Sequence, residues 1–319
     1  MLKKTASIVK IILYYIYDTC YFIRFGSKLY PNRIEHLERD ILILTHVIEK
    51  GLSYNKPHAG FGKIKIKMLV DNIIKYINMG YDTNKFVIEN AISALQEYLA
   101  FNNSKGQSEP EILNFINENL EKYLNINNNH CAGIVVKQKE DINITNSFED
   151  VFSCRSSIRE FDEMDLNDSD IYSVITMVMK TPSACNRQPC KIYDVKSKNI
   201  IEEIQNFHGG MKGFNNIKRI FVITVNLSKY LNAGDRNLMY IDGGLLAMSL
   251  LLSLQNKGIA TCAIQWQQLL KNNRFIGRLL NLPEEERTVI LIAAGNYPKT
   301  FKVCKSAKMS INEFYNILG

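Results

Sequence analysis

The 319-residue sequence has few residues of several types that mark particular classes of protein. It contains one tryptophan and seven prolines, and its seven cysteines include no pair with C-x-x-C spacing. An odd number of widely spaced cysteines argues against a disulfide framework and against a cysteine zinc site. The five histidines also lack paired carboxylates at the spacing of a metal site or a catalytic triad. We therefore expect a cytoplasmic protein without a bound metal.

The charge is mildly basic but is not concentrated. Lysine and arginine number 39 against 32 acidic residues, which gives a formal charge of +7 and a pI near 8.9. The basic residues form no runs of the kind that bind nucleic acid, so we expect no nucleic-acid partner. An anionic cofactor or substrate would account for part of the excess.

The sequence begins with a short apolar run rather than a long one. Lys10, Asp18 and Arg24 interrupt it, and the uncharged stretch Ile11–Tyr17 is much shorter than the ~20 residues that span a bilayer. No small-residue cleavage site of a signal peptide follows. We expect an amphipathic helix that packs on protein rather than on a membrane surface.

The first half of the chain has the periodicity of helices. From residue 33 to about 123, apolar residues recur three and four positions apart, as in Leu37, Ile41, Leu44 and Ile48. Polar breaks follow at 102–108 and 125–129. We expect an all-helical domain over residues 1–130, a linker over 131–147 with a short strand near 132–136, and a second domain over 148–319.

One helical turn in this half gathers polar groups. His46, Glu49 and Lys50 fall within a single turn, and Gly51 is a candidate C-cap. His46 and Lys50 could face a substrate. Alternatively, Glu49 and Lys50 form a solvated helix end and His46 is a hydrogen-bonded helix residue.

Helices and strands alternate in the second half, which indicates a layered α+β domain. The predicted helices cover residues 167–180, 200–207, 241–256 and 273–280, and the predicted strands cover 192–195, 220–225, 260–264 and 289–294. The helix at 241–256 is apolar nearly all round, and Gly243 and Ala247 give it a ridge of small residues. Such a helix must be buried, either in the core of one chain or against a partner.

Two prolines bracket the stretch T-P-S-A-C-N-R-Q-P that starts at Thr181. Pro182 and Pro189 fix their own φ angles and restrict the preceding residues, so we expect Gln188 to be extended. The amides of Asn186 and Gln188 both donate and accept hydrogen bonds. They suit a flat heterocycle whose edge alternates carbonyl oxygens with an N–H group, as a flavin edge does. The stretch therefore predicts a rigid binding loop.

Four segments together resemble the FMN-dependent nitroreductase superfamily. The loop at 181–189 is similar to that family's P-S-x-x-N-x-Q-P segment, and R-S-S-I-R at 155–159 is close to its R-R-S-I-R. D-G-G at 242–244, followed by K-G-I-A-T-C at 257–262, resembles D-x-G…G-L-G-T-C. A-A-G-N-Y-P at 293–298 resembles the family's late strand and turn. The four segments occur in family order over residues 148–310.

The resemblance implies a fold and an activity. The fold would be a mainly antiparallel central sheet flanked by helices, in an entwined homodimer whose interface includes the helix at 241–256. The activity would be hydride transfer from NAD(P)H to FMN and then to a small oxidised acceptor, in a ping-pong cycle without a catalytic side chain. Reductive dehalogenation and flavin breakdown remain open on the same fold. A further alternative is a flavin-binding accessory protein, whose helical domain would bind a partner in surface-polysaccharide assembly. The stretch H-V-I-E-K-G-L that starts at His46 resembles an H-x-I-E-K-G-L segment that precedes nitroreductase-like domains linked to surface-polysaccharide genes.

The resemblance also implies which residues contact the cofactor: Arg155, Ser156, Ser157, Arg159, Pro182, Ser183, Asn186, Gln188, Ala263, Ile264, Gln265, Lys305 and Lys308. The arginines and serines at 155–159 would hold the phosphate and ribityl chain, and the backbone at 263–265 would lie near the hydride-accepting nitrogen. Lys308 stands where relatives often have an arginine, so it keeps the charge but loses bidentate geometry. Trp266 could line the pocket or lie in the core, and the turn at 208–210 could be a mobile lid.

Overall fold

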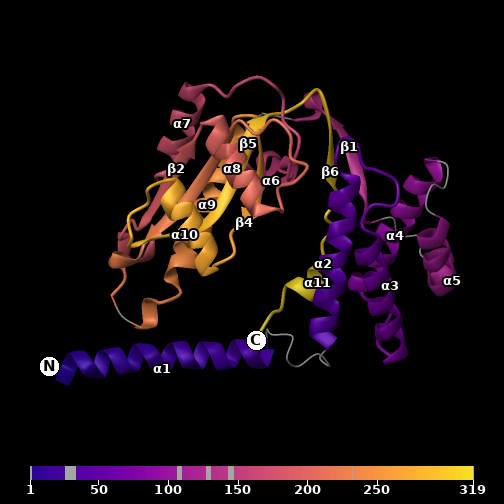
Figure 1. Cartoon of the computed structure of the whole chain (residues 1–319), viewed down its shortest axis with the longest axis horizontal. Helices are drawn as coiled ribbons and strands as arrows, with labels where there is room; N and C mark the ends of the chain where they lie inside the picture. Colours follow the sequence, from indigo (N-terminus) through magenta and orange to yellow (C-terminus); the bar gives the residue numbers. More distant parts are fainter. Residues whose placement is uncertain are drawn as a thin grey trace. The chain divides into compact units, whose positions relative to one another are not determined.

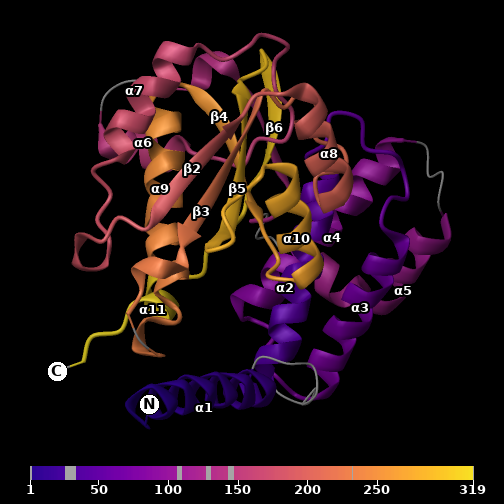
Figure 2. The ribbon, with the colours of Figure 1, turned by 60° about the vertical axis from the view of Figure 1, so that its left-hand side comes forward.

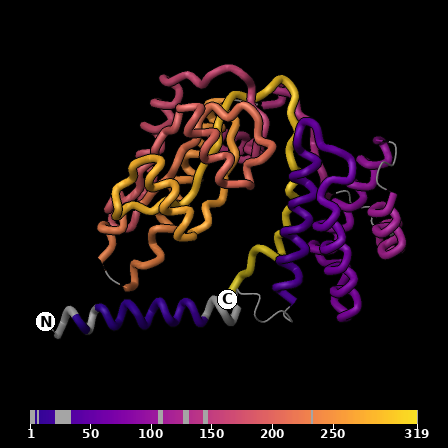
Figure 3. Tube along the Cα trace, viewed as in Figure 1, coloured from indigo at the N-terminus to yellow at the C-terminus, as the bar shows by residue number. Residues whose placement is uncertain are grey.

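The computed structural model describes residues 2–25, 34–105, 110–126, 131–142, 147–231 and 233–318 (Figure 1). The chain forms two compact units, which can be followed along the trace in Figure 3. The sheet unit comprises residues 1–14 and 136–301, and the helical unit comprises 15–135 and 302–319. The boundaries fall within α1 (Leu2–Phe25), β1 (Ile134–Gln138) and β6 (Thr300–Cys304).

The helical unit is built from α2 (Ile34–Leu52), α3 (Lys63–Asn78), α4 (Phe86–Ser104) and α5 (Pro110–Ile126). This confirms the helical pattern of the first half. The predicted apolar positions of α2 are buried, and α4 is buried on most sides because it packs against both α2 and α5. The short helix α11 (Ile311–Phe314) also belongs to this unit.

Two expectations for the end of α2 are wrong. Glu49 is not solvated: it is 3% exposed, and its carboxylate accepts a 3.0 Å hydrogen bond from the backbone N–H of Gly133. Gly51 is not a C-cap, since α2 continues through Leu52. A Cβ at Gly51 would lie 2.1 Å from Cε2 of Phe61, so glycine is required there for close packing.

The sheet unit contains a four-stranded antiparallel sheet with the order β2–β3–β5–β4, as the family resemblance implies. Its strands are β2 (Cys190–Val195), β3 (Arg219–Asn226), β5 (Glu286–Asn296) and β4 (Ile259–Gln265), and all four predicted strand segments are present. β3 is buried along almost its whole length. A separate two-stranded sheet pairs β1, the predicted short strand, with β6.

Helices cover both faces of the four-stranded sheet (Figure 2). α7 (Asp168–Val178) and α9 (Leu238–Asn256) share a core with Phe221 and Ile223 of β3. α8 (Lys198–His208) and α10 (Leu270–Leu279) lie on the other side, where Phe207 and Phe275 stack at 3.8 Å. The short helix α6 (Phe148–Cys154) precedes these elements, and 3₁₀ turns occupy 139–141, 184–186, 227–229 and 233–235.

About half of the apolar helix α9 is buried against the rest of the sheet unit. The segment 233–256 is long and apolar enough to cross a membrane, but this helix packs on the sheet as a core element. A Cβ at Gly243 would lie 2.9 Å from Val289 of β5, so the small-residue ridge that includes Ala247 faces the chain's own sheet. Ile241 and Leu245, on another side of the helix, are 56% and 45% exposed.

Candidate functional site

The loop between α7 and β2 adopts a strained conformation. Cys185, Asn186 and Gln188 have φ angles of 51°, 52° and 48°, in the left-handed region that residues other than glycine rarely adopt. The expectation that Gln188 is extended is therefore wrong. Its backbone N–H donates to Oγ of Ser183 at 2.9 Å, which holds the chain turned just before Pro189. Strain of this kind is concentrated at binding and active sites.

A buried carboxylate holds this loop. Asp242, at the start of α9, is 2% exposed and accepts hydrogen bonds from the backbone N–H of Ala184 at 3.0 Å and from the Tyr230 hydroxyl at 2.9 Å. Burial and the hydrogen bond to Asp242 raise the pKa of Tyr230, so this hydroxyl remains a donor at neutral pH. Sequence reasoning placed Asp242 in a motif but gave it no role.

A second contact network closes the other side of the loop. The Arg187 guanidinium donates to the carbonyl of Ala184 at 3.0 Å and to Asp235 at 2.7 Å, and it lies over the Tyr230 ring at 5.2 Å. The bond from Arg187 holds the pKa of Asp235 below its usual value. Nothing in the sequence spacing indicated these partners.

A cavity of about 300 Å³ lies beside the loop. It is lined by Pro182, Ser183, Gln188, Cys190 and Asp242 together with the end of α7. Asn186 and Gln188 are exposed, so their amides are accessible to a ligand. Burial raises the pKa of Cys190 to about 12, which keeps this thiol protonated at neutral pH.

A second hollow, of about 460 Å³, lies on the other side of Thr181 and Pro182. Phe148 and Val151 of α6 and Leu252 of α9 contribute to it. The start of the loop therefore separates two hollows, of which only the first is lined by residues 183–190.

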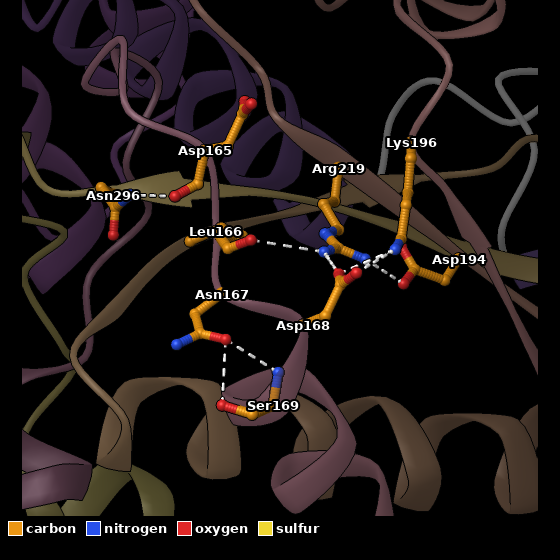
Figure 4. Close-up of polar contacts among 9 residues, drawn as sticks. All are labelled: Asp165, Leu166, Asn167, Asp168, Ser169, Asp194, Lys196, Arg219 and Asn296. Carbon is orange, nitrogen blue, oxygen red and sulfur yellow. Dashed lines mark hydrogen bonds and ion pairs between the residues drawn. The ribbon is translucent and has the colours of Figure 1, made fainter.

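An ion-pair cluster fixes the start of α7, the helix that leads into the loop (Figure 4). The Arg219 guanidinium, on β3, pairs with both Asp168 and Asp194 and lies close to the carbonyl of Leu166. Lys196 adds bonds of 2.7 and 2.8 Å to Asp168. The cluster joins β2, β3 and the first turn of α7, so the helix begins at a defined place on the sheet.

The arginine segment 155–159 runs along the β4 edge of the sheet. Ser157 forms a bridge with Thr261, and the backbone N–H of Ile158 donates to the Thr261 carbonyl at 2.8 Å. Arg155 is half-buried at the end of α6, whereas Arg159 is only 7% exposed. The two arginines are therefore not equally accessible.

The arginine segment and the loop lie at opposite corners of the sheet. Ser157 bridges to Thr261 of β4, which pairs with Ala294 of β5. The loop enters β2 at Cys190, next to Val225 of β3, which pairs with Arg287 of β5. Across the sheet, the two corners are three strand spacings of ~4.8 Å apart, and along the strands they are seven residues of ~3.3 Å apart. The distance between them is therefore roughly 27 Å. One chain therefore does not bring its own predicted phosphate-binding and ring-binding residues together.

The end of β4 presents alternating side chains. Ala263 and Gln265 are exposed and Ile264 is buried. His208 of α8 is hydrogen-bonded through Nε2 to the Gln265 carbonyl at 2.7 Å. Trp266 is a core residue, 3% exposed, and its indole N–H donates to Asn273 at 3.2 Å.

The two C-terminal lysines belong to the helical unit. Lys305 lies 3.8 Å from the Glu97 carboxylate, and its backbone N–H donates to Gly133. Lys308 follows in the same unit. Their assignment to the cofactor stays a prediction. Among the residues that the structure describes, no group of three metal-ligating side chains is found.

One comparison with known proteins identifies a family for part of the chain. A sequence model described as the Nitroreductase family matches residues 153–212. No curated protein sequence matches the chain.

The chain is also similar to solved structures, of which three are described next. A nitroreductase family protein from Clostridium novyi is 22% identical, covering 48% of this chain and 86% of its own, with a TM-score of 0.44. An FMN-dependent nitroreductase from Clostridium difficile is 16% identical over 52% and 93%, with a TM-score of 0.43. A nitroreductase family protein from Streptococcus pneumoniae is 17% identical over 54% and 100%, with a TM-score of 0.47. The match at 153–212 contains the arginine pair and the binding loop, so this part of the sheet unit is similar to the nitroreductase family.

Proposed function

We propose that the protein is an FMN-dependent oxidoreductase that takes hydride from NAD(P)H and passes it to a small oxidised acceptor. The observation that carries the proposal is the strained loop at 183–188, which Asp242 holds in place beside a cavity. Hydrogen bonds from the loop to Asp242 and to Ser183 stabilise this conformation within the chain, which reduces the ordering cost of binding. The same loop lies within the segment that matches the nitroreductase family.

The residues present fit a flavin mononucleotide. The exposed amides of Asn186 and Gln188 can donate to and accept from the edge of a flavin ring, and Pro182 offers an apolar surface next to it. Arg155 is accessible enough to pair with a phosphate, with the hydroxyls of Ser156 and Ser157 nearby in the chain.

The bound flavin would supply the hydride chemistry, and the protein would supply binding and orientation. The exposed edge of β4 at Ala263 and Gln265 gives one side of the site, and the buried Ile264 fixes the strand to the core. No side chain need act as a nucleophile or a general base. Because the flavin would carry the hydride between the two half-reactions, NAD(P)H and the acceptor could use the same pocket in turn.

We also propose that the site is completed in a homodimer. A second copy related by a twofold axis can bring the arginine segment of one chain next to the loop of the other, which a single chain does not do. An apolar surface is available for this contact: Phe148 is 70% exposed and Met177 43%, with Ile241 and Leu245 of α9. Exposed apolar surface of this kind marks association sites.

The test is an absorbance spectrum of the purified protein, followed by anaerobic addition of NADH or NADPH. Bands near ~370 and ~450 nm, which oxidised flavin gives, should be present and should bleach with the nicotinamide. A protein that is colourless and takes up no added FMN would refute the cofactor assignment.

Matched variants separate the two parts of the proposal. Asn186→Ala should weaken FMN binding without changing the mass in sedimentation, because we assign its exposed amide to the flavin edge and not to the dimer contact. Leu245→Glu on the exposed side of α9 should produce monomers that lose FMN as well. A monomeric wild-type protein that binds FMN tightly would contradict the shared site.

A further inference from the structure

The first helix, α1, exposes an unusual amount of apolar surface. Each apolar or tyrosine side chain from Ile8 to Tyr17 is at least 38% exposed. Lys10, the one charged residue in this stretch, is exposed as well. Exposure reaches 59% at Leu13 and 61% at Tyr17. The Tyr14 ring faces the Arg236 guanidinium at 5.0 Å. That this helix packs on protein stays a prediction.

The helix has two chemically different sides. Ile8 and Ile12 each lie two positions from Lys10, about 200° around the helix, and Ile16 continues their row. Tyr14 and Tyr17 lie four and seven positions after Lys10 and so share its side. As a sequence, residues 2–25 carry four basic residues and one acidic residue, Asp18. One side is thus isoleucine-rich, and the other combines Lys10 with tyrosines.

We propose that α1 lies flat in the surface of a lipid bilayer that contains anionic lipids. An isoleucine-rich side opposite a basic side with tyrosines is the pattern of interfacial helices, in which the tyrosines sit at the headgroup level. The basic side complements the negative potential of an anionic leaflet. A partner helix would cover only a narrow seam, whereas the apolar residues of α1 extend around Val9, Leu13 and Tyr15 as well.

A spanning orientation does not suit the same residues. Lys10 and Asp18 would both lie within the hydrocarbon layer if this helix, ~36 Å long at ~1.5 Å per residue, crossed the membrane. Among the described residues, only the segment 233–256 meets the length and hydropathy of a spanning helix. The interfacial position keeps both charges in the headgroup region.

The full-length protein should be mixed with phosphatidylglycerol–phosphatidylcholine vesicles and centrifuged by flotation. We expect it to float with these vesicles at low salt. Binding should weaken at 1 M salt, because the Debye length falls to ~3 Å. On vesicles of phosphatidylcholine alone, binding should be about fivefold weaker for each lysine that contacts the surface. Failure to float, or equal binding to both kinds of vesicle, would overturn the proposal.

A matched pair of variants tests the orientation. Ile12→Gln removes one apolar side chain from the buried side and should lower partitioning about tenfold or more. Tyr17→Gln, on the opposite side, should change it by less than about threefold. Equal losses in the two variants would contradict an interfacial helix. A lower sedimentation mass of Ile12→Gln without lipid would show that this side binds a second copy instead.

Discussion

Replacing Asp242 by alanine is the most direct test of how the binding loop is held. The carboxylate is the acceptor for both the Ala184 N–H and the Tyr230 hydroxyl, and it is almost completely buried. Asp242→Ala leaves two donors without that acceptor. It should therefore release the loop rather than unfold the sheet, whose hydrogen bonds do not include this side chain.

The size of the effect follows from two opposing terms. A hydrogen bond to a charged group contributes about 1.5–3 kcal/mol, and each left-handed residue other than glycine costs about 1–2 kcal/mol. The loop contains three such residues, at 185, 186 and 188. Without Asp242 the strained loop loses the energy of this hydrogen bond, so re-forming the binding conformation should cost about 1.5–3 kcal/mol. This corresponds to an increase of roughly 13- to 160-fold in the Kd for FMN.

The assay is FMN titration by flavin fluorescence, with thermal unfolding of each variant as a check on folding. Tyr230→Phe is the matched control, because it keeps the Ala184 bond and should change the Kd less than about fivefold. Asp242→Asn should lie between the two, since its amide oxygen can still accept from Ala184. A folded Asp242→Ala protein with the Kd of the wild type would refute the tether.

Three further predictions concern single residues. Arg219→Met should lower the free energy of unfolding by about 2–3 kcal/mol, because Asp194, 28% exposed, loses its guanidinium; denaturant titration showing no loss would contradict this. The lowered pKa of Asp235 means that its stabilisation is present above the usual aspartate value of ~3.9 and is lost as pH falls through the lower folded value. Asp235→Asn should thus flatten the fall in melting temperature at acid pH, and an unchanged acid slope would exclude this role. Iodoacetamide at pH 8 should modify the exposed Cys185 well before Cys190, whose pKa is raised to about 12, and FMN should protect Cys185; peptide mass mapping showing equal rates would be the opposite result.

The strands of the sheet could be predicted from the sequence because the pattern of each strand lies within its own residues. The apolar run at 220–225 is long enough to be a buried strand, and the structure extends it only to Arg219–Asn226. The helix pattern of α2 was equally local. Such signals need only the residues of the element itself.

The contacts that hold the site could not be predicted from the sequence in this way. Asp242 and Ala184 are 58 residues apart, and Glu49 and Gly133 are 84 apart. No spacing rule connects such pairs, because the fold alone brings them together. The same applies to Gln188: the proline rule predicts an extended residue, but a hydrogen bond to Ser183 overrides it.

The pairing of β1 with β6 has a consequence for synthesis of the protein. Thr300 of β6 bonds Gln138 of β1, 162 residues earlier, so the second strand leaves the ribosome long after the first. At ~5–20 residues per second, the delay is roughly 8 to 30 s. During this time β1 has no strand partner, and an unpaired edge is a template for aggregation. Lys137 within the strand supplies a charge that discourages such pairing until translation delivers β6.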